Sequence, residues 1–332
     1  MDITKLTSRR FLLVAGLILL LLIFLATFPL HGSRSDVFVV TIILMYVILT
    51  VSWAMFSGST GYLSLAPAAF LGVGIYTSAL LYSEKWALLP LPAVIIIAGV
   101  VSFVLALLVG LVTLRLKGTY FAFFTFGLVL LISQLFVFWE LHIVGRRGQH
   151  VIPVSGDTVY YVMLGITVAT LLTVYFIRRS RLGLAMQSIG GNEEAAAHMG
   201  VNTTRVKILS FAISSVFMGA AGAIMATKWI YVDPVVAFNV FYSFMPVLMA
   251  VFGGMGQFYG PIIGAVIFAY TERALRLEFP YYYMLSFGII LILVILYLPG
   301  GLAGLIPRLW NRLRGPISKL WKGGEAEQHA NT

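Results

Sequence analysis

The sequence contains no cysteine and few charged residues. The absence of cysteine excludes a disulfide framework, a thiolate metal site and a thiol nucleophile. Only 10% of the 332 residues are charged, whereas soluble domains carry about a quarter. Since 60% of the residues are hydrophobic, the composition predicts a protein that crosses a membrane several times.

The signatures of common enzymes are also absent. The sequence has no H-E-x-x-H helix, no G-x-S-x-G turn and no phosphate-binding loop of the form G-x-x-x-x-G-K-S/T. The five histidines lack the spacing of metal ligands: His31, His142, His150, His198 and His329. We therefore expect no catalytic residue, no metal site and no cofactor, and any ATP hydrolysis must take place on another polypeptide.

Long apolar runs predict an all-α integral membrane protein with about ten transmembrane helices. In order, the runs cover 11–30, 37–56, 65–82, 87–114, 119–139, 159–177, 206–229, 238–252, 259–271 and 281–298, of which 238–252 and 259–271 are short. The predicted organisation is an N-terminal segment at 1–10, a transmembrane domain at 11–305 and a basic tail at 306–332.

Basic residues are distributed unevenly between the two sides of these spans. With ten spans and the N-terminus inside, about 15 of the 22 Lys and Arg residues flank the inner side. Because loops rich in Lys and Arg stay in the cytoplasm, we expect both termini to be cytoplasmic. The net charge of +10 follows from the same bias, so it does not predict nucleic-acid binding.

A polar stretch at 178–207 interrupts the apolar runs and is predicted to face the cytoplasm. Its centre has the pattern of a short helix: an N-cap residue, two acids that complement the helix dipole, helix-favouring alanines, and a glycine able to end the helix in a left-handed conformation. These residues are Asn192, Glu193, Glu194, Ala195, Ala196 and Gly200. A helix of about two turns is marginal alone in water, so it needs a surface on its own protein or on a partner.

Two glycine-rich stretches, SGSTGYLS at 57–64 and FGGMGQFYG at 252–260, interrupt apolar runs. Irregular backbone at membrane depth is tolerated where it is buried or lines a water-filled path, and its polar groups can then meet a solute. Tight turns between helices would explain the same residues, and both interpretations stay open. On the first, the candidate translocation path comprises Ser57, Ser59, Thr60, Ser64, Gly253, Gly254 and Gln257.

Ionisable residues are almost absent from the centres of the spans, which disfavours a proton- or sodium-coupled carrier. We interpret the cluster at 272–278 as solvated charge at the membrane interface, and the loop at 140–150 as exposed surface. Small residues recur at four-residue spacing at Ser215, Gly219 and Ala223, a pattern that lets helices approach closely in lipid.

Four stretches carry a family resemblance. They are GSTGYLSLAPAAFLGVGIYTSALL at 58–81, LRLKGTYFAFFTFG at 114–127, SRLGLAMQSIGGNEEAAAHMGVNTTRVKILSFAISS at 180–215 and VFGGMGQFYGPIIGAVI at 251–267. On these, the chain resembles the LivM-type permease subunit of branched-chain amino-acid ABC importers. The third stretch is similar to the cytoplasmic coupling loop of such permeases, whose helix seats in a groove of the ATPase. By that resemblance the coupling-loop positions are Asn192, Glu193, Glu194, Ala195, Ala196 and Gly200.

The resemblance implies an ABC importer permease in the bacterial inner membrane. The implied partners are a second permease subunit, two cytoplasmic ATPase subunits and an extracytoplasmic solute-binding protein. Two departures stand out, because Ala66-Pro67 replaces the usual Gly-His, and 144–148 replaces an outer Thr-Gly-Gly run and adds two positive charges. Similar permeases handle urea and short amides, which are alternative solutes. A stand-alone carrier or channel and a membrane scaffold are alternative classes.

Overall fold

Helices account for almost all of the residues that the structure describes. The computed structural model describes residues 16, 20–82, 89–116, 118–229, 231–279 and several single residues between 281 and 304. A helix at Leu20–His31 is followed by α2 (Arg34–Trp53), α3 (Pro67–Leu81), α4 (Leu91–Thr113), α5 (Thr119–Trp139), α6 (Gly156–Arg179), α7 (Arg181–Gly191), α8 (Glu193–His198), α9 (Thr203–Trp229), α10 (Pro234–Ala237), α11 (Phe241–Gly253) and α12 (Gly260–Glu278).

Two π-helical turns and two short strands complete these elements. The turn η1 (Ala54–Gly58) continues α2, and η2 (Glu140–Val144) continues α5. Strand β1 (Gln149–His150) pairs antiparallel with β2 (Tyr231–Val232).

Six segments of the described chain are long and apolar enough to cross a membrane. They are Arg34–Gly58, Leu91–Thr113, Thr119–Val144, Gly156–Arg179, Thr203–Trp229 and Pro234–Gly253. Helices Leu20–His31 and α3 are apolar but shorter, and α12 is not among the six. The all-α membrane class is therefore confirmed, whereas six spans are found where about ten were predicted. The segments 1–10 and 306–332 and most of the run 281–298 lie outside the described residues.

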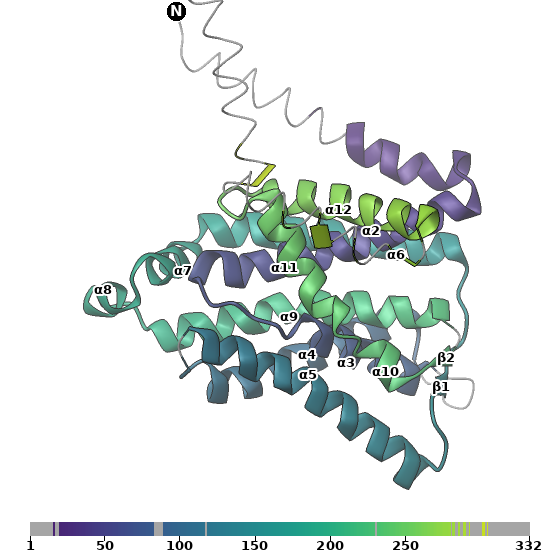
Figure 1. Ribbon diagram of the computed structural model, residues 1–332, viewed down its shortest axis with the longest axis horizontal. Coiled ribbons are helices and arrows are strands. Elements are labelled where there is room, and N and C mark those ends of the chain that lie inside the picture. Colours follow the sequence, from purple (N-terminus) through teal and green to yellow (C-terminus); the bar gives the residue numbers. More distant parts are fainter. Residues whose placement is uncertain are drawn as a thin grey trace, which may run out of the picture.

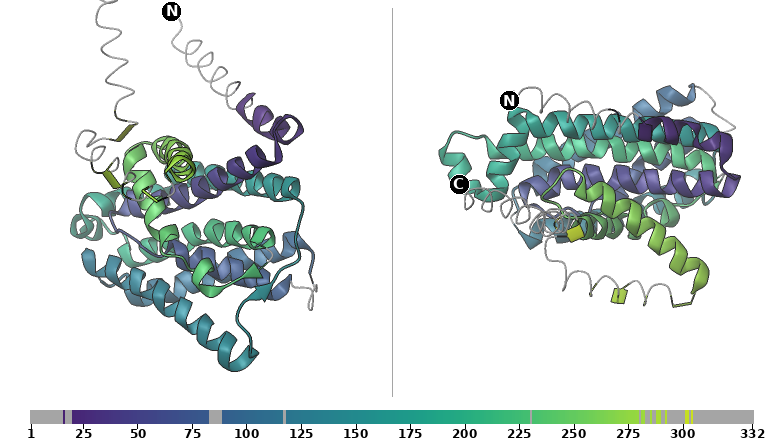
Figure 2. Two further views of the ribbon diagram at one scale, coloured as in Figure 1. Left: turned by 45° about the vertical axis from the view of Figure 1, so that its right-hand side comes forward. Right: turned by 90° about the horizontal axis from the view of Figure 1, so that it is seen from above.

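The long helices run roughly parallel in two layers with α9 between them (Figure 1). One layer holds α2, α6 and α12, the other holds α3, α4 and α5, and α11 crosses obliquely from one layer to the other. Helices α7 and α8 lie at one end of the molecule, called here the α8 end, and β1 and β2 lie at the opposite end. The two views in Figure 2 show that helix Leu20–His31 joins α2 at the β1–β2 end. There, the Tyr160 hydroxyl donates a hydrogen bond of 2.6 Å to the Leu25 carbonyl.

Small residues let α9 occupy the centre. The apolar window of Thr203–Trp229 is 78% buried, against 33% for that of Leu91–Thr113. The predicted stripe of Ser215, Gly219 and Ala223 is wholly buried, and the Ser215 hydroxyl donates a hydrogen bond of 3.0 Å to the Ser102 carbonyl of α4. The stripe is thus a close-packing surface, as its spacing predicts.

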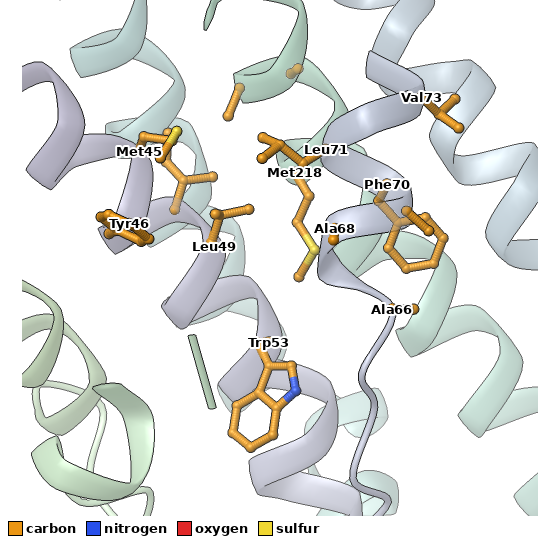
Figure 3. Packing of buried hydrophobic residues seen from close by; sticks show 14 of the residues in the cluster. Met45, Tyr46, Leu49, Trp53, Ala66, Ala68, Phe70, Leu71, Val73 and Met218 are labelled. Carbon is orange, nitrogen blue, oxygen red and sulfur yellow. The ribbon is translucent and has the colours of Figure 1, made fainter. Parts of the chain in front are cut away.

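The interior near the start of α3 is filled by aromatic and sulfur-containing side chains. Met218 of α9 reaches into the space between α2 and α3 (Figure 3). The Trp53 indole N–H donates a hydrogen bond of 2.7 Å to the Ser64 carbonyl. Ser64 lies outside the helices, so its carbonyl has no partner within a helix and needs this one. The segment 59–66 connects η1 to α3 and is irregular from 61 to 66. It is anchored at Ser64, while Gly61 and Leu63 are exposed.

Candidate functional site

Helix α8 forms as its sequence predicts. The Asn192 side-chain oxygen accepts a hydrogen bond of 3.0 Å from the backbone N–H of Ala195, which is the contact expected of an N-cap. Gly200 has φ of +85°, in the left-handed region that glycine adopts without steric cost. The local conformation of the 192–200 stretch is confirmed, while its role is a separate question.

The two faces of α8 differ in burial. Ala196 is 4% exposed and packs against the protein, whereas Glu194, Ala195 and Ala197 are exposed. Met199, directly after the helix, is 86% exposed, although it is a large apolar residue. Helix α8 also protrudes beyond the ends of the long helices (Figure 1). It therefore presents a small, partly apolar face at the tip of the molecule.

Glu193 points the other way, into an ion pair with a buried lysine. The Lys207 ammonium of α9 lies 2.6 Å from the Glu193 carboxylate, and the Lys207 side chain is only 4% exposed. The Tyr62 hydroxyl donates a hydrogen bond of 2.5 Å to the second carboxylate oxygen. The sequence predicts Glu193 to be a coupling-loop residue whose charge complements the helix dipole, and its pairing with Lys207 is a finding of the structure.

All three donors of the Lys207 ammonium have acceptors. Besides Glu193, they are the Tyr62 hydroxyl at 3.0 Å and the Leu114 carbonyl at 3.2 Å. Burial and the hydrogen bond to Glu193 raise the pKa of Tyr62, so the phenol stays protonated and keeps its donor. A lysine near the start of an apolar run is the signal that could have revealed this cluster, because a buried ammonium requires partners.

In the first glycine-rich stretch, 57–64, side-chain hydroxyls form hydrogen bonds with nearby backbone groups. Ser57, Thr60 and Ser64 are buried. The Ser57 hydroxyl accepts a hydrogen bond of 3.3 Å from the Ser64 N–H, and the Thr60 hydroxyl donates one of 2.8 Å to the Phe56 carbonyl. These three side chains therefore support the irregular segment, and Ser59 alone of the four predicted residues in the stretch borders the cavity described next.

A cavity of about 370 Å³ lies at the α8 end between η1, α6, α7 and the loop before α12. Ser59, Arg178 and Gln187 supply polar groups to its lining, and Met255 and Gly256 come from the second glycine-rich stretch. The structure thus brings the two stretches together across one cavity, as a shared path requires.

None of the three predicted path residues of the second stretch borders that cavity. Gly253 packs against Gly260 and Gly264 so closely that an added methyl group would overlap their backbone. Gly254 has φ of +97°, which disfavours any side chain there. The side-chain oxygen of Gln257 is buried and accepts no hydrogen bond from the described residues.

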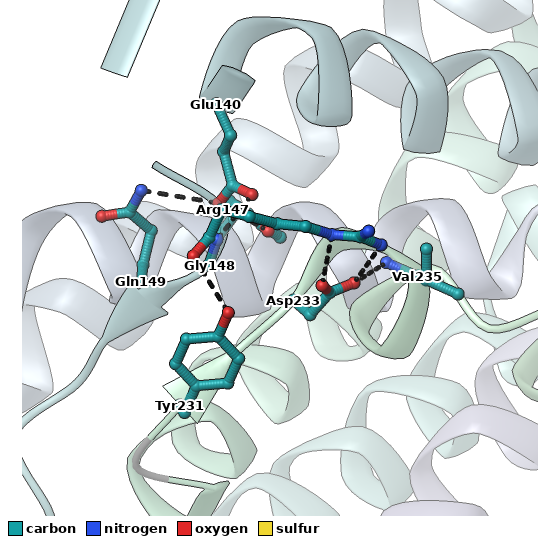
Figure 4. Close-up of polar contacts among 8 residues, drawn as sticks. Glu140, Arg147, Gly148, Gln149, Tyr231, Asp233 and Val235 are labelled. Atoms are coloured by element: carbon teal, nitrogen blue, oxygen red, sulfur yellow. Dashed lines mark hydrogen bonds and ion pairs between the residues drawn. The ribbon is translucent and has the colours of Figure 1, made fainter. Parts of the chain in front are cut away.

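A second polar cluster lies at the β1–β2 end (Figure 4). Glu140 is fully buried and accepts hydrogen bonds from the Tyr76 hydroxyl at 3.0 Å, the Gly148 N–H at 2.8 Å and the Gln149 side chain at 3.4 Å. The interpretation of 140–150 as exposed surface is therefore wrong for Glu140 and Gln149, because the loop folds back over the carboxylate. It holds for His142, which is exposed.

The two arginines of this loop, Arg146 and Arg147, both form contacts with other side chains of the protein. The Arg147 guanidinium lies 2.8 Å from the Asp233 carboxylate, and the Arg146 side chain donates a hydrogen bond of 3.3 Å to Gln149. The Tyr231 hydroxyl donates a further hydrogen bond of 2.9 Å to the Arg147 carbonyl.

The remaining charged cluster lies near the end of α12. Arg276 is exposed and forms an ion pair with Glu272 one turn earlier, and Glu278 is exposed. The side chain of Glu272 is only 14% exposed, so the predicted solvated cluster is solvated in part. Among the described residues, no group of three or more His, Asp or Glu side chains is placed to hold a metal ion.

These features define a polytopic helical membrane protein with a partly polar cavity at one end. The chain belongs to the family of permease components of branched-chain amino acid transport systems, whose model matches residues 36–295. Members of this family are transport permeases, so the chain is a transport subunit and not an enzyme.

Curated relatives agree with this family. The chain is 29% identical over 318 residues to the high-affinity branched-chain amino acid transport system permease protein LivM of Salmonella typhimurium, covering 85% of this chain and 73% of the relative. It is 27% identical to LivM of Escherichia coli with the same coverage. It is also 32% identical over 138 residues to LivH of Escherichia coli, covering 41% of this chain and 44% of that permease. No solved structure matches the chain significantly.

Proposed function

We propose that this chain forms part of the translocation path of an ATP-binding-cassette importer for branched-chain amino acids. ATP hydrolysis takes place on two separate cytoplasmic subunits, a second permease subunit completes the path, and an extracytoplasmic binding protein delivers the solute. The protein resides in a bacterial inner membrane with both termini in the cytoplasm. Family membership and the names of the LivM relatives support this solute class.

The single observation that carries the coupling to an ATPase is the position of α8. The helix protrudes at one end of the molecule with Glu194 outward, and the exposed Met199 next to it supplies apolar surface that a partner would cover (Figure 1). We assign Glu194, Ala197 and Met199 to the docking face. Ala196 packs inward, so its part in coupling is to seat α8 on its own protein.

On this proposal, the solute path includes the cavity between the two glycine-rich stretches, 57–64 and 252–260. The cavity is bordered by Gln187 and Gly190 of α7, at the same end of the molecule as α8. Ser59, Gln187 and backbone groups of the loop before α12 offer polar contacts, and Arg178 is the charged residue in the lining. Weak contacts of this kind suit a path through which a solute must pass, since affinity then resides in the delivery protein.

Co-purification and transport test the proposal. The tagged chain, solubilised from its source cells, should bring two ATPase subunits and a second permease. The variant Glu194→Arg with Met199→Glu should lose the ATPases and retain the permease partner. Glu278→Arg, an equally exposed change on α12, should lose neither.

Solute identity is tested with the same complex in proteoliposomes. Uptake of labelled leucine should need ATP and the binding protein, and unlabelled isoleucine or valine should compete. Competition by urea or a short amide in place of these amino acids would assign a different solute. Uptake by the purified chain without ATP would contradict the importer and indicate a stand-alone carrier or channel.

A further inference from the structure

We propose that Glu193, Lys207 and Tyr62 form a rigid connector that transmits movement of α8 to the irregular segment 59–66 beside the cavity. This inference rests on the proposed function, in which α8 is the element that the ATPases move. Glu193 and Lys207 are positioning residues on this view, and neither needs to touch the solute.

The connector joins three parts of the chain that are far apart in sequence. Glu193 belongs to α8, Lys207 to α9 and Tyr62 to segment 59–66, and each side chain contacts the other two at 2.5–3.0 Å. The Lys207 ammonium also lies 4.4 Å from the centre of the Tyr62 ring. A closed triangle of short, charge-assisted contacts has little freedom to rearrange, because each side chain is held from two directions.

Helix α8 has few other ways to transmit force into the membrane domain. It is six residues long, and Ala196 is its only buried residue. The alanine side chain makes only van der Waals contacts. The Glu193 carboxylate accepts hydrogen bonds from the Tyr62 hydroxyl and the Lys207 ammonium. Movement of α8 toward or away from the membrane domain therefore acts on Lys207 and Tyr62 through these hydrogen bonds, in addition to its direct chain connection to α7.

Segment 59–66 leads from the connector to the cavity. Ser59 and Gly61 border the cavity, and Tyr62 follows directly in the chain. The far side of the segment is fixed, because the Leu65 N–H donates a hydrogen bond of 2.9 Å to the Thr125 hydroxyl of α5. A displacement at Tyr62 is then shared between residues 62–65 and residues 59–62, and the latter part borders the cavity.

Neighbouring acids of α8 consequently have different tasks. Glu193 turns into the protein, while Glu194 is exposed on the face assigned to docking. The family resemblance assigns both residues to the coupling loop without distinguishing them. Their separation gives the connector a test that is independent of docking.

The alternative is that the cluster only stabilises α8. In that case its loss would lower assembly, and ATP hydrolysis and solute uptake would fall together. Loss of a connector instead leaves the ATPases bound and hydrolysing while less solute moves. The ratio of solute transported to ATP hydrolysed therefore distinguishes a connector from a cluster that only stabilises α8.

The decisive experiment uses the complete importer in proteoliposomes with its binding protein and labelled leucine. The double variant Glu193→Gln with Lys207→Met removes both charges, so neither remains buried without its partner. We expect about a tenfold fall in solute moved per ATP, which is a coupling of ordinary size, with normal co-purification of the ATPases. Arg205→Met, which removes a charge from an exposed position two residues away on α9, should keep the wild-type ratio.

A second variant decides the matter if the double variant fails to assemble. Tyr62→Phe keeps the ion pair and removes only the phenol oxygen that leads to segment 59–66, and it should also lower the ratio. A wild-type ratio in Tyr62→Phe or in an assembled double variant would overturn the connector. Absence of ATP-dependent uptake by the wild-type complex would instead overturn the proposed function.

The absence of cysteine allows a test of rescue. With Cys introduced at positions 193 and 207, a short thiol-reactive bifunctional reagent should restore the ratio, and a reductant that cleaves the reagent should abolish it again. Cross-linking that goes to completion without any recovery would contradict a mechanical role. Variants carrying one of the two cysteines serve as controls for attachment without a link.

Discussion

Gly74 of α3 and Gly219 of α9 pack backbone against backbone. A methyl group added to Gly74 would overlap the Gly219 carbonyl, and one added to Gly219 would overlap Ser102 of α4. The central helix is therefore held at distances that only glycine permits at these two positions. Close approach of this kind strengthens van der Waals packing, which attracts helices in lipid, where burial of apolar surface contributes little.

Gly74→Ala should destabilise the protein, because overpacking in a filled interior typically costs about 1–3 kcal/mol. The measurement is the thermal unfolding midpoint of the purified protein in detergent. Gly165→Ala provides the matched control, since its added methyl group meets no atom within 4 Å, and it should leave the midpoint unchanged or slightly higher. An equal effect of both changes would mean that helix propensity, and not close packing, decides the outcome.

Glu140 should be structurally important despite its place in a polar loop. Glu140→Ala leaves the donors of Tyr76 and Gly148 without their acceptor, and each buried donor so orphaned costs about 1–3 kcal/mol. Glu140→Gln keeps one acceptor oxygen and should cost less. Unfolding midpoints test this order, with Glu278→Ala as the exposed control. A neutral Glu140→Ala would show that water replaces the carboxylate.

Asp233 and Arg147 form one ion pair, yet their loss should have unequal effects. Asp233 is also the N-cap of α10 and accepts a hydrogen bond of 2.8 Å from the Val235 N–H, so Asp233→Ala should cost about 1 kcal/mol for the cap alone. Arg147 is half exposed, so Arg147→Ala should cost less than about 1 kcal/mol. Thermal midpoints of both variants, at low and high salt, would reveal the difference. A larger effect for Arg147 would contradict the capping role.

Local features of this fold were predictable from the sequence, and the contacts between distant segments were not. The caps of α8 and the stripe on α9 depend on residues close together in the chain, so their patterns predict them directly. The Glu193, Lys207 and Tyr62 cluster joins positions up to 145 residues apart, and no local pattern indicates which acid turns inward. The number of spans stays a prediction, because the described residues contain six candidate spans, the apolar helices Leu20–His31 and α3 are shorter, and most of the run 281–298 lies outside the described residues.

The candidate path shows the same limit. Its serines and threonine suggested polar groups available to a solute, but irregular buried backbone needs hydrogen-bond partners of its own. Ser57, Thr60 and Ser64 are used in that way. Which hydroxyl remains for a solute depends on how the backbone turns after η1, and the sequence alone does not determine that turn.

The orientation in the membrane can be tested with single cysteines, because the natural chain has none to remove. Cys at position 146, at the β1–β2 end, should react with a membrane-impermeant maleimide added to intact spheroplasts. Cys at position 199, beside α8, should react only in inside-out vesicles. The physical reason is the excess of Lys and Arg on the α8 side, which keeps those loops in the cytoplasm. Labelling in the reverse pattern would place α8 outside and would remove the basis for ATPase docking.

The same cysteine at 199 reports on docking. If Met199 belongs to the face that the ATPases cover, labelling in inside-out vesicles should increase when the ATPase subunits are stripped from the membrane. Cys at position 205, exposed on α9 but outside the assigned docking face, should show a smaller increase. Equal labelling of position 199 with and without the ATPases would show that orientation is right and docking is elsewhere, so the two conclusions are tested separately by one set of variants.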